Sequence, residues 1–444
     1  MIAYFFNYGQ KIRFLCLFIA WTGAIAQVLF GDQLGQIVNI GALAYAGFII
    51  LTVVRLRRDS ILILLMLTVV AWSLISQWPD QQDWTAGGRY ILIFSAFLPT
   101  MVMVRATALT MPSVHRTQTA LSKLPAEAAS GGFQLAANMF GGVINLGALA
   151  ILSAAVPANA NLQRRKLGAE ATLRGMVTAA AWSPFFVAFA VGQSFTDPLN
   201  SWIAIAMGSV TTVVFALITI PVFNRSFTLA QLRLVAGCLA PVLVRILVVL
   251  AAVLAAAIIF GFTALSAVVV VMPVLIVIQF ALNPPMMPVI VQEGRRSIKS
   301  MADDIVIISV SMLIGHFAVS TDIFNELFST MHTGMIPGWW ALMITPSVMM
   351  VASLVGVHPV ISSVALLSVF SNGNADVHPA LLMQAHLIGW GAGTMSSVAS
   401  LSAITCANLF NIPIRQIVLG PNLLAALGYA VLGGAVLSLV NLAL

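Results

Sequence analysis

Long apolar segments follow one another along the whole chain, and short loops that hold most of the charged residues separate them. Only 7% of the 444 residues are charged, whereas about 25% are charged in a typical soluble domain. Hydrocarbon offers no partner to backbone N–H and C=O groups, so a spanning chain must satisfy them within helices or a closed barrel. The segments are too long for barrel strands and lack a two-residue alternation. The sequence therefore predicts an all-α polytopic membrane protein.

Basic side chains occur in alternate loops, and cytoplasmic loops carry an excess of Lys and Arg in membrane proteins. If Lys11 and Arg13 are cytoplasmic, apolar segments that cross in turn place the basic loops on that same side. These loops centre on Arg57, Arg116, Arg165, Arg225, Arg295 and Arg415. The pattern predicts a cytoplasmic N-terminus and about eleven full crossings, in a bacterial inner membrane.

Two apolar segments have flanks of the same charge at both ends. Residues 128–157 lie between basic flanks, and residues 339–371 lie between flanks that contain Asp322 and Asp376 but no Lys or Arg. The acidic flank also holds Glu326 and His332. A helix that crosses once does not return to the side it left, so each segment is expected to be a re-entrant hairpin. A helical pair that crosses fully would leave the same charges, and that alternative stays open.

The same two regions resemble each other in sequence. Residues 137–160 and 352–375 share seven identities, which are Ala137/Ala352, Gly141/Gly356, Ala150/Ala365, Leu152/Leu367, Ser153/Ser368, Asn159/Asn374 and Ala160/Ala375. A second match pairs residues 173–175 and Ser183 with residues 387–389 and Ser397. Similar sequences with oppositely charged flanks are typical of an inverted repeat, whose sites lie where the two copies meet.

The repeat divides the chain into four ranges. Residues 1–88 are expected to be scaffold helices, residues 89–222 the first repeat, residues 223–302 further scaffold helices with a linker, and residues 303–444 the second repeat. The first repeat contains the hairpin at 128–157 and a broken helix at 171–195, and the second contains the hairpin at 339–371 and a broken helix at 381–408.

Each half has a span, an amphipathic connection, a Gly-rich hairpin and a span with a polar break, in that order. This order, over roughly residues 90–411, resembles the ion transporter superfamily of secondary carriers. That superfamily includes the divalent-anion sodium symporters and the large membrane subunit of tripartite carriers that depend on a periplasmic binding protein. The resemblance implies an elevator mechanism, a scaffold that forms a homodimer, and ion-coupled uptake of a small anion.

The resemblance does not extend to the residues that hold sodium and carboxylate in the divalent-anion symporters. Those proteins have Ser-Asn-Thr at the hairpin tips and Thr-Pro in the broken spans. Here the tips read Val-Ile-Asn-Leu-Gly at 143–147 and His-Pro-Val-Ile-Ser-Ser at 358–363, and the breaks read Ala-Trp-Ser-Pro at 181–184 and Thr-Met-Ser-Ser at 394–397. Only Asn145 matches a residue of that family.

Polar residues at the tips and breaks are the candidate substrate-binding residues. They are Asn138, Asn145, Ser183, His358, Ser362, Ser363, Thr394, Ser396 and Ser397. Pro184 and Pro359 lie inside apolar runs, where a missing N–H predicts an interrupted helix. Half-helix N-termini attract anions and unwound carbonyls bind cations, so such a site needs no Lys or Arg.

Asn145 and His358 are also the candidates for the coupling ion, which would be sodium or a proton. An ionisable group at a membrane hairpin tip is unusual, and histidine titrates near neutral pH. Two alternatives stay open: the Asn145 amide bridges two helices, and His358 is a neutral histidine bonded to a backbone carbonyl. Hydroxyls in membrane helices also serve close packing. His316 and His386 are expected nearer to span ends and are weaker candidates.

Other functions find less support in the residues. The chain contains no zinc-type His-Glu-x-x-His, no nucleophile elbow, no phosphate loop and no paired carboxylates within a span, so we expect no catalysis and no cofactor. The spacing of the three cysteines, Cys16, Cys238 and Cys406, matches no metal site. The net charge of +7 comes from loops whose basic residues set the orientation in the membrane, so no nucleic-acid partner is expected. Asp303 and Asp304 follow a basic loop and are expected to be a solvated helix start.

Two further alternatives share the predicted architecture. The first is a cation/proton antiporter or an exporter of an inorganic anion. An antiporter would need a titratable carboxylate within a span, and none is evident in the predicted spans. The second is a membrane subunit that receives its substrate from a binding protein, in which case an accessory polypeptide would be a partner.

Overall fold

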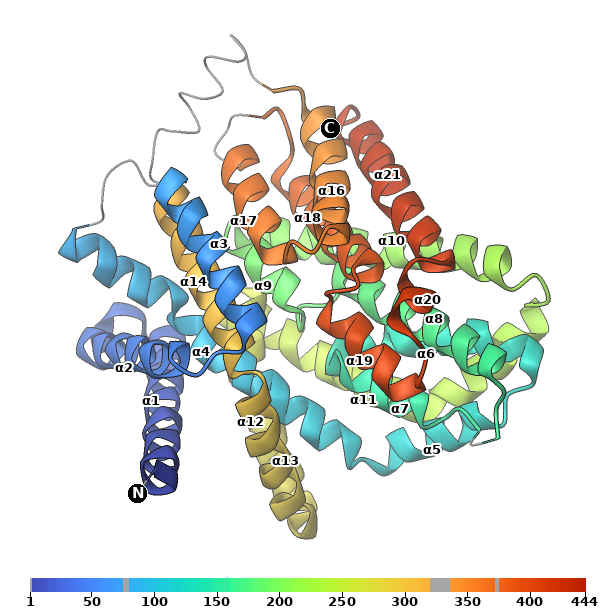
Figure 1. Ribbon diagram of the computed structural model, residues 1–444, viewed down its shortest axis with the longest axis horizontal. Coiled ribbons are helices and arrows are strands. Elements are labelled where there is room, and N and C mark those ends of the chain that lie inside the picture. The colour runs from blue at the N-terminus through green and yellow to red at the C-terminus, as the bar shows by residue number, and fades with distance from the viewer. Residues whose placement is uncertain (1, 75–79, 158, 320–335, 372–374) are drawn as a thin grey trace. The chain divides into compact units, whose positions relative to one another are not determined.

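The computed structural model describes residues 2–74, 80–157, 159–319, 336–371 and 375–444 (Figure 1). Regular structure in these ranges is helical apart from one isolated bridge between Ile336 and Ala375. The predicted loop residues Asp322, Glu326 and His332 lie outside the described residues, as does Asn374 of the aligned repeat. The all-α prediction is confirmed for the described ranges.

Several helices are long and apolar enough to cross a bilayer. Seven meet this condition in the described ranges: α1 (Ile2–Phe30), α2 (Gly35–Val53), α4 (Gln81–Leu109), α10 (Pro198–Phe223), α11 (Leu229–Phe260), α12 (Ala264–Leu282) and α21 (Pro421–Asn441). The bent pair α18 (Pro379–Ser396) and α19 (Leu401–Phe410) adds an eighth, with an angle of 42° between its parts. The chain is therefore a transmembrane helical protein.

Three of the eleven expected crossings coincide with helices that do not meet the length and hydropathy condition by themselves. They are α3 (Arg58–Leu74), α14 (Ala302–Val319), and the interrupted series α8 (Leu162–Thr178), η2 (Ala179–Ala181) and α9 (Val187–Gln193). α3 has a shorter apolar core, and the last series is divided by a non-helical segment. Each predicted crossing thus has a helical counterpart in the described residues.

The chain forms two compact units, and each is described by itself. The first contains residues 1–106 and 256–334, and the second contains residues 107–255 and 335–444. This division differs from the four ranges expected from the repeat. α4 and α14 belong to the first unit, whereas α10 and most of α11 belong to the second.

The first unit holds α1 to α4, α12, α13 (Met287–Ser300) and α14. α1 packs closely on α2, because a Cβ on Gly23 would lie only 2.8 Å from the Cα of Gly41. α14 packs on α3 through Asp303, whose Oδ2 accepts hydrogen bonds from the Arg57 backbone (3.0 Å), from Arg57 Nε (3.1 Å) and from Ser60 Oγ (2.9 Å). The expectation of a solvated helix start is wrong for Asp303, which is buried and joins two helices.

The second unit contains both predicted hairpins and both predicted broken helices. Its helices are α5 (Pro112–Ser122), α6 (Ala126–Ile144), α7 (Gly147–Ser153), α8, η2, α9, α10, most of α11, α16 (Gly338–Leu354), α17 (Pro359–Phe370), α18, α19, α20 (Ile414–Val418) and α21. Side-chain caps begin several of them. Asn161 accepts from the Arg164 N–H at the start of α8 (2.8 Å), and Asp197 accepts from the Asn200 N–H at the start of α10 (3.0 Å).

Candidate functional site

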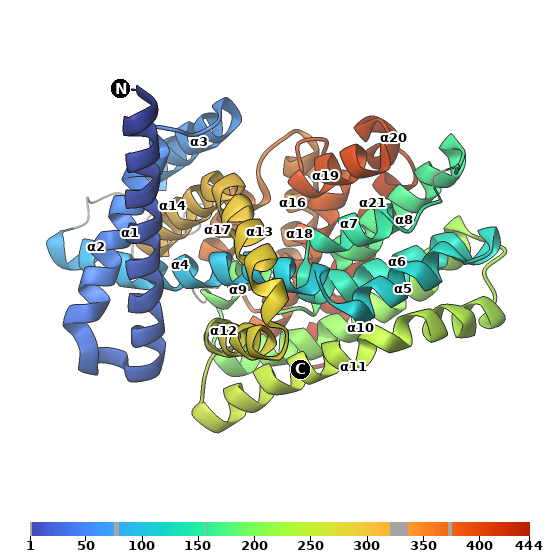
Figure 2. The same ribbon diagram turned by 90° about the horizontal axis from the view of Figure 1, so that it is seen from below.

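The described part of the second unit contains two hairpin turns and two broken helices. Each turn belongs with one break, at residues 182–186 between η2 and α9 or at residues 397–400 between α18 and α19. α6 and α7 are separated by a turn at Asn145, and α16 and α17 by residues 355–358. α6 runs along α8, and α16 runs along α18 (Figures 1 and 2). In addition, α7 packs on α19 and α17 packs on α9. The second arm of each hairpin therefore contacts the broken helix of the other half.

Glycines allow each hairpin to approach its broken helix. A Cβ on Gly175 would lie 2.0 Å from the Gln134 carbonyl oxygen and 3.0 Å from Ala137, and a Cβ on Gly389 would lie 2.9 Å from Pro346 Cα and 3.1 Å from Met349. Gly175 and Gly389 are also paired in the sequence alignment. This packing makes Ala137 equivalent to Met349.

The glycine packing gives a register for the two hairpins that differs from the one in the sequence alignment. The alignment pairs Ala137 with Ala352, nearly one helical turn beyond Met349. It also pairs Gly141, which lies within α6 against Met176, with Gly356, which lies in a turn with φ +94°. Apolar helices share small residues readily, so identities between them do not fix which residues of the two segments correspond.

Asn145 forms the first tip and has an unusual backbone conformation, with φ 48° and ψ −123°. Few side chains adopt positive φ, and asparagine tolerates it better than most. Its backbone N–H donates to Gly141 O (3.0 Å), and its carbonyl accepts from Ala148 N (2.9 Å). The side chain is half-buried and has no hydrogen-bond partner within the described part of the chain. It does not form the amide bridge that was the alternative.

Asn138 forms a bridge of that kind from the middle of α6. Its Nδ2 donates to Gly175 O (3.1 Å) and Thr178 Oγ1 (3.3 Å) in α8, and its Oδ1 accepts from Trp182 Nε1 (3.2 Å). Asn138 therefore lies within α6 and not at the tip with Asn145. The amide of Asn138 connects the first hairpin to its broken helix.

Ser183 connects the first break to the first tip. It is fully buried, and its hydroxyl donates to the Gly142 carbonyl and accepts from the Phe185 N–H (3.1 Å). Pro184 lies in the non-helical segment between η2 and α9, as predicted. The carbonyl oxygen of Ala181, at the start of this segment, accepts a hydrogen bond from the Gln384 side-chain amide of α18 (3.2 Å). This holds in the orientation of the Gln384 amide that places its nitrogen toward the Ala181 and Ala204 carbonyls.

His358 and Pro359 begin the second arm of the second hairpin. His358 Nδ1 accepts from the Val360 N–H (3.2 Å), so the imidazole is the N-cap of α17 and its Nδ1 carries no proton. Pro359 is at the first helical position, where a missing N–H is tolerated. The interruption precedes Pro359. The Ser362 and Ser363 hydroxyls are buried and donate to Pro359 O, at 3.1 and 2.7 Å.

The second break resembles the first in its local hydrogen bonding. Ser397 ends α18 and accepts from the Ala399 N–H (3.2 Å), as Ser183 accepts from Phe185. Ser396 donates to Ala392 O (2.9 Å) within α18, and Thr394 is buried in the last turn of that helix. A serine that bonds the second following N–H therefore marks both breaks.

Three aromatic rings connect the second tip with the first broken helix. Trp390 of α18 is edge-on to His358 at 6.4 Å between centroids and edge-on to His386 at 5.9 Å. His386 is fully buried, and its Nε2 is 2.9 Å from Ala188 O of α9. Nε2 therefore carries the proton, and the buried Nδ1 has no partner in the described part of the chain. His386 lies closer to the interruptions than the sequence suggested.

Sequence reasoning missed a buried ionic network in α8. Arg174 is 2% exposed; its Nε donates to Gln134 Oε1 (3.0 Å), and its Nη1 donates to Asn422 Oδ1 (3.1 Å). The guanidinium also lies over the Phe223 ring at 4.3 Å. Glu170, one turn earlier, is 3% exposed and its Oε1 is 3.7 Å from Lys166 Nζ. The four-residue spacing of Glu170 and Arg174 was the available signal.

The described residues hold no group of three or more His, Cys, Asp or Glu side chains that could bind a metal ion. No protein-family model matches the chain, and no curated protein matches its sequence. The chemistry available at the interruptions is therefore that of amides, hydroxyls, imidazoles and helix ends. The N-termini of α17 and α19 both begin at interruptions, and helix N-termini favour anions.

Proposed function

We propose that the protein is a secondary active transporter of a small anion, with an organic carboxylate as the substrate class. In this proposal the second unit is the moving transport domain of an elevator, and the first unit is the scaffold, which forms a homodimer. One observation carries the proposal. The four interruptions described above belong to one compact unit, and the second arm of each hairpin contacts the broken helix of the opposite half.

The proposed topology is an inverted repeat with eleven full crossings and two re-entrant hairpins, in a bacterial inner membrane with a cytoplasmic N-terminus. Equivalent packing of Gly175 and Gly389, and equivalent serines at the breaks, support two copies of one unit. Opposite charges beside the two hairpins support opposite orientations.

The substrate contacts proposed are helix ends and side chains at the interruptions that form no side-chain hydrogen bond to another helix within the described residues. These are the Asn145 side chain at the first tip, and the α17 and α19 N-termini with Ser362, Ser363 and Thr394 nearby. Asn138 and Ser183 are fully bonded to neighbouring elements, so we assign them to positioning the first tip. Dipoles and hydroxyls bind a carboxylate well where water is excluded.

His358 is the proposed site of proton coupling. Its Nδ1 caps α17 only when it carries no proton, so protonation at Nδ1 removes the hydrogen bond from Val360 and adds a positive charge at the tip. Both changes alter the second tip at the position where an anion would bind. If sodium is the coupling ion, Asn145 and unwound carbonyls are the proposed ligands.

Transport in proteoliposomes tests this proposal. Uptake of small carboxylates should require an imposed proton or sodium gradient, and Asn145→Ala and His358→Ala should each lower the rate at least tenfold. His378→Ala is the matched control, because His378 also caps a helix through Nδ1, at the start of α18 and away from the interruptions. Wild-type uptake in both site variants would exclude this site. Gradient-independent flux would exclude secondary transport.

A cation/proton antiporter on the same architecture is the second candidate, and buried Glu170 favours it. An antiporter needs a carboxylate that exchanges a proton for a cation. In that case Glu170→Gln should abolish cation-driven proton movement across proteoliposomes. An anion carrier should retain carboxylate uptake in this variant.

A further inference from the structure

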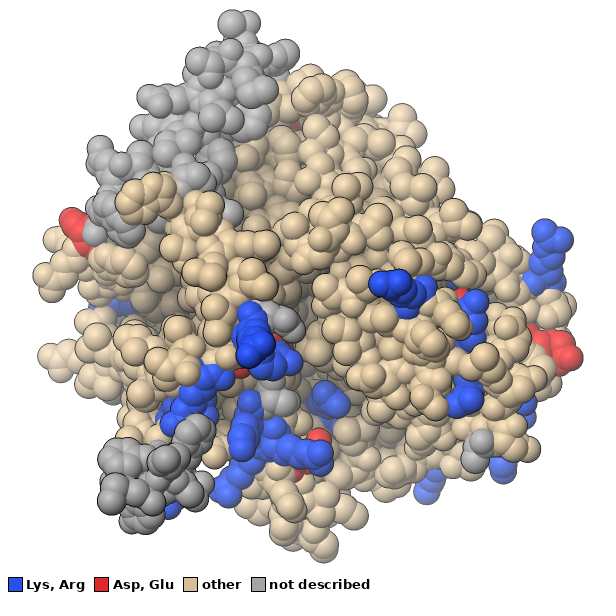
Figure 3. Space-filling model, in the orientation of Figure 1, with Lys and Arg blue, Asp and Glu red and all other residues tan. Residues whose placement is uncertain are grey.

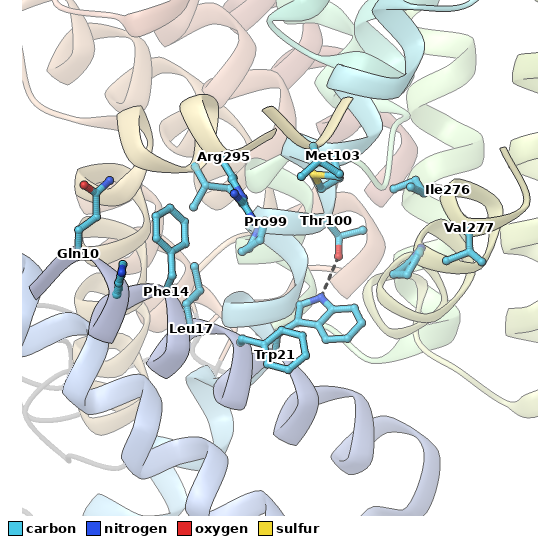
Figure 4. Close-up of a pocket in the computed structure, with 15 residues that line it drawn as sticks. Gln10, Phe14, Leu17, Trp21, Pro99, Thr100, Met103, Ile276, Val277 and Arg295 are labelled. Atoms are coloured by element: carbon cyan, nitrogen blue, oxygen red, sulfur yellow. Dashed lines mark hydrogen bonds between the residues drawn. The ribbon is translucent and has the colours of Figure 1, made fainter. Parts of the chain in front are cut away.

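The first unit contains a large apolar cavity that the proposed transport reaction does not use. Its volume is about 1110 Å³, and α1, α4, α12 and α13 form its walls. Small-molecule pockets measure roughly 300–1,000 Å³, so this one suits a larger ligand. Pro99 and Pro273, which interrupt the hydrogen bonding of α4 and α12, line it. Figure 4 shows Phe14, Leu17 and Trp21 of α1 beside Pro99 and Thr100.

Polar groups are distributed unequally along the cavity. Where Trp21 lines the cavity, its Nε1 donates to Thr100 Oγ1 (3.3 Å), so these two polar groups of the cavity wall are bonded to each other. Lys11, ten residues before Trp21 on α1, and Arg295 of α13, which lies near Phe14 in Figure 4, also line the cavity and are exposed. Neither forms an ion pair within the described ranges. The ligand should therefore be apolar along most of its length and anionic at one end.

The length of the cavity along α1 matches one leaflet of a bilayer. Ten residues separate Lys11 from Trp21 in the sequence, which corresponds to about 15 Å of helix. The hydrocarbon core of a bilayer is about 30 Å thick, so one leaflet contributes about half. A headgroup at Lys11 would then place the ends of its acyl chains near Trp21.

The surroundings of the charged end add to its positive potential. α13 carries Arg295, Arg296 and Lys299 in two turns, with Glu293 as its one acidic residue. Glu293 Oε1 accepts from Ser297 Oγ (3.3 Å) on the same helix. Figure 3 shows Lys and Arg side chains gathered where α13 lies in Figure 1. Anionic headgroups are attracted to basic clusters of this kind beside membrane helices.

We propose that this cavity binds one molecule of an anionic glycerophospholipid. Lys11 and Arg295 contact the phosphate, and the acyl chains lie along Phe14, Leu17 and Trp21. The phospholipid would fill an open hollow in the surface of the first unit, which makes it a structural ligand of the proposed scaffold. Charge complementarity at one end and the length of one leaflet carry this assignment.

Native mass spectrometry of the full chain in detergent tests the site, with phosphatidylglycerol and phosphatidylcholine of the same acyl chains as probes. One phosphatidylglycerol should bind at least tenfold more tightly than phosphatidylcholine. Each charge near a headgroup changes affinity about fivefold, so Arg295→Gln should weaken phosphatidylglycerol binding about fivefold and the pair with Lys11→Gln about 25-fold. Arg296→Gln removes the same charge from the next position of α13, which does not line the cavity, and should therefore weaken phosphatidylglycerol binding less than Arg295→Gln does.

A second pair of variants tests the apolar walls. Val277 lines the cavity and is 63% exposed, whereas Ile278, the next residue of α12, is 47% exposed and does not line it. Val277→Trp should weaken binding of both lipids at least tenfold, and Ile278→Trp should not. Three results would overturn the proposal: equal affinity for the two lipids, equal effects of Arg295→Gln and Arg296→Gln, or displacement of the lipid by inorganic phosphate. If Val277→Trp disrupted a dimer and left lipid binding unchanged, the cavity would be occupied by a second copy of the chain and not by a phospholipid, which would also overturn the proposal.

Discussion

Side-chain hydrogen bonds hold the first hairpin against its broken helix, whereas the second hairpin meets its broken helix through glycines and apolar contacts. Asn138 and Ser183 bond α6 to α8 and to the first break. At the second tip, His358, Ser362 and Ser363 bond only within α17 in the described residues, and His358 meets α18 only through its ring contact with Trp390.

The solvent exposure of the residues beside the two tips also differs between the first and the second hairpin. Ile144, directly before the first tip, is 4% exposed, whereas Val355, directly after α16, is 75% exposed. Opening the second tip would break none of the three hydrogen bonds of His358, Ser362 and Ser363, whereas opening the first would break those of Asn138 and Ser183. We infer that the first tip is a fixed part of the proposed site and that the second tip is the part that moves.

The largest difference between the two hairpins should come from their packing glycines. Gly175→Ala should lower the free energy of unfolding by about 3 kcal/mol, because its Cβ would lie 2.0 Å from a backbone carbonyl oxygen. Gly389→Ala should lower it by a smaller amount, about 1–2 kcal/mol, because its closest backbone atom, Pro346 Cα, would lie 2.9 Å from the Cβ, and Met349 Sδ at 2.8 Å belongs to a side chain that can turn. Thermal unfolding in detergent measures both.

Gly428→Ala is the control for this pair, since Gly428 lies in α21 with no atom within 4 Å of an added Cβ. It should leave stability unchanged or raise it by up to about 1 kcal/mol, from helix propensity. Equal losses in the Gly175 and Gly389 variants would remove the packing difference between the hairpins.

The two break serines should differ by a smaller amount. Ser183→Ala leaves the Gly142 carbonyl and the Phe185 N–H buried without their partner, which should lower the free energy of unfolding by about 1–3 kcal/mol. Ser397→Ala removes one bond, to the N–H of exposed Ala399, and should lower it by about 1 kcal/mol or less. Denaturant unfolding monitored by tryptophan fluorescence compares them. A larger loss in the Ser397 variant would contradict the assignment of Ser183 as the connection between break and tip.

The smallest difference is expected between the two Val-His-Pro segments. His358 and His378 both cap a helix through Nδ1, with acceptor distances of 3.2 and 3.3 Å, and proline follows each. Loss of an N-cap costs about 0.5–2 kcal/mol, so His358→Ala and His378→Ala should reduce stability by similar amounts. If only His358→Ala reduced stability, the expected loss of transport in this variant would be explained by unfolding and not by a role of His358 in transport.

The helix interruptions could be located from the sequence, because each carries a local signal. Pro184, Pro359 and the break serines are visible in the sequence, and the structure places interruptions beside each of them. The exact tips were not predictable from identities between apolar helices, which share small residues whatever their register. Packing of Gly175 and Gly389 decides the register, and it is a tertiary property.

Hydrogen bonds between residues far apart in the chain could not be predicted from the sequence either. The burial of Arg174 depends on Gln134, 40 residues away, and on Asn422, 248 residues away. Gln384 reaches a carbonyl at the first break from the second half of the chain. A single sequence marks such residues as polar within apolar surroundings, but it does not identify their partners.

Hydrogen exchange measured by mass spectrometry tests most directly whether the second tip moves while the first stays fixed. For the full chain in lipid nanodiscs, exchange would be compared between the backbone amides of residues 143–149 and those of residues 355–361 other than Pro359, which cover the two tips. Exchange at the second tip should be at least tenfold faster than at the first, and a transported carboxylate should slow it at the second tip alone. Equal exchange at the two tips, or faster exchange at the first, would contradict this division of roles.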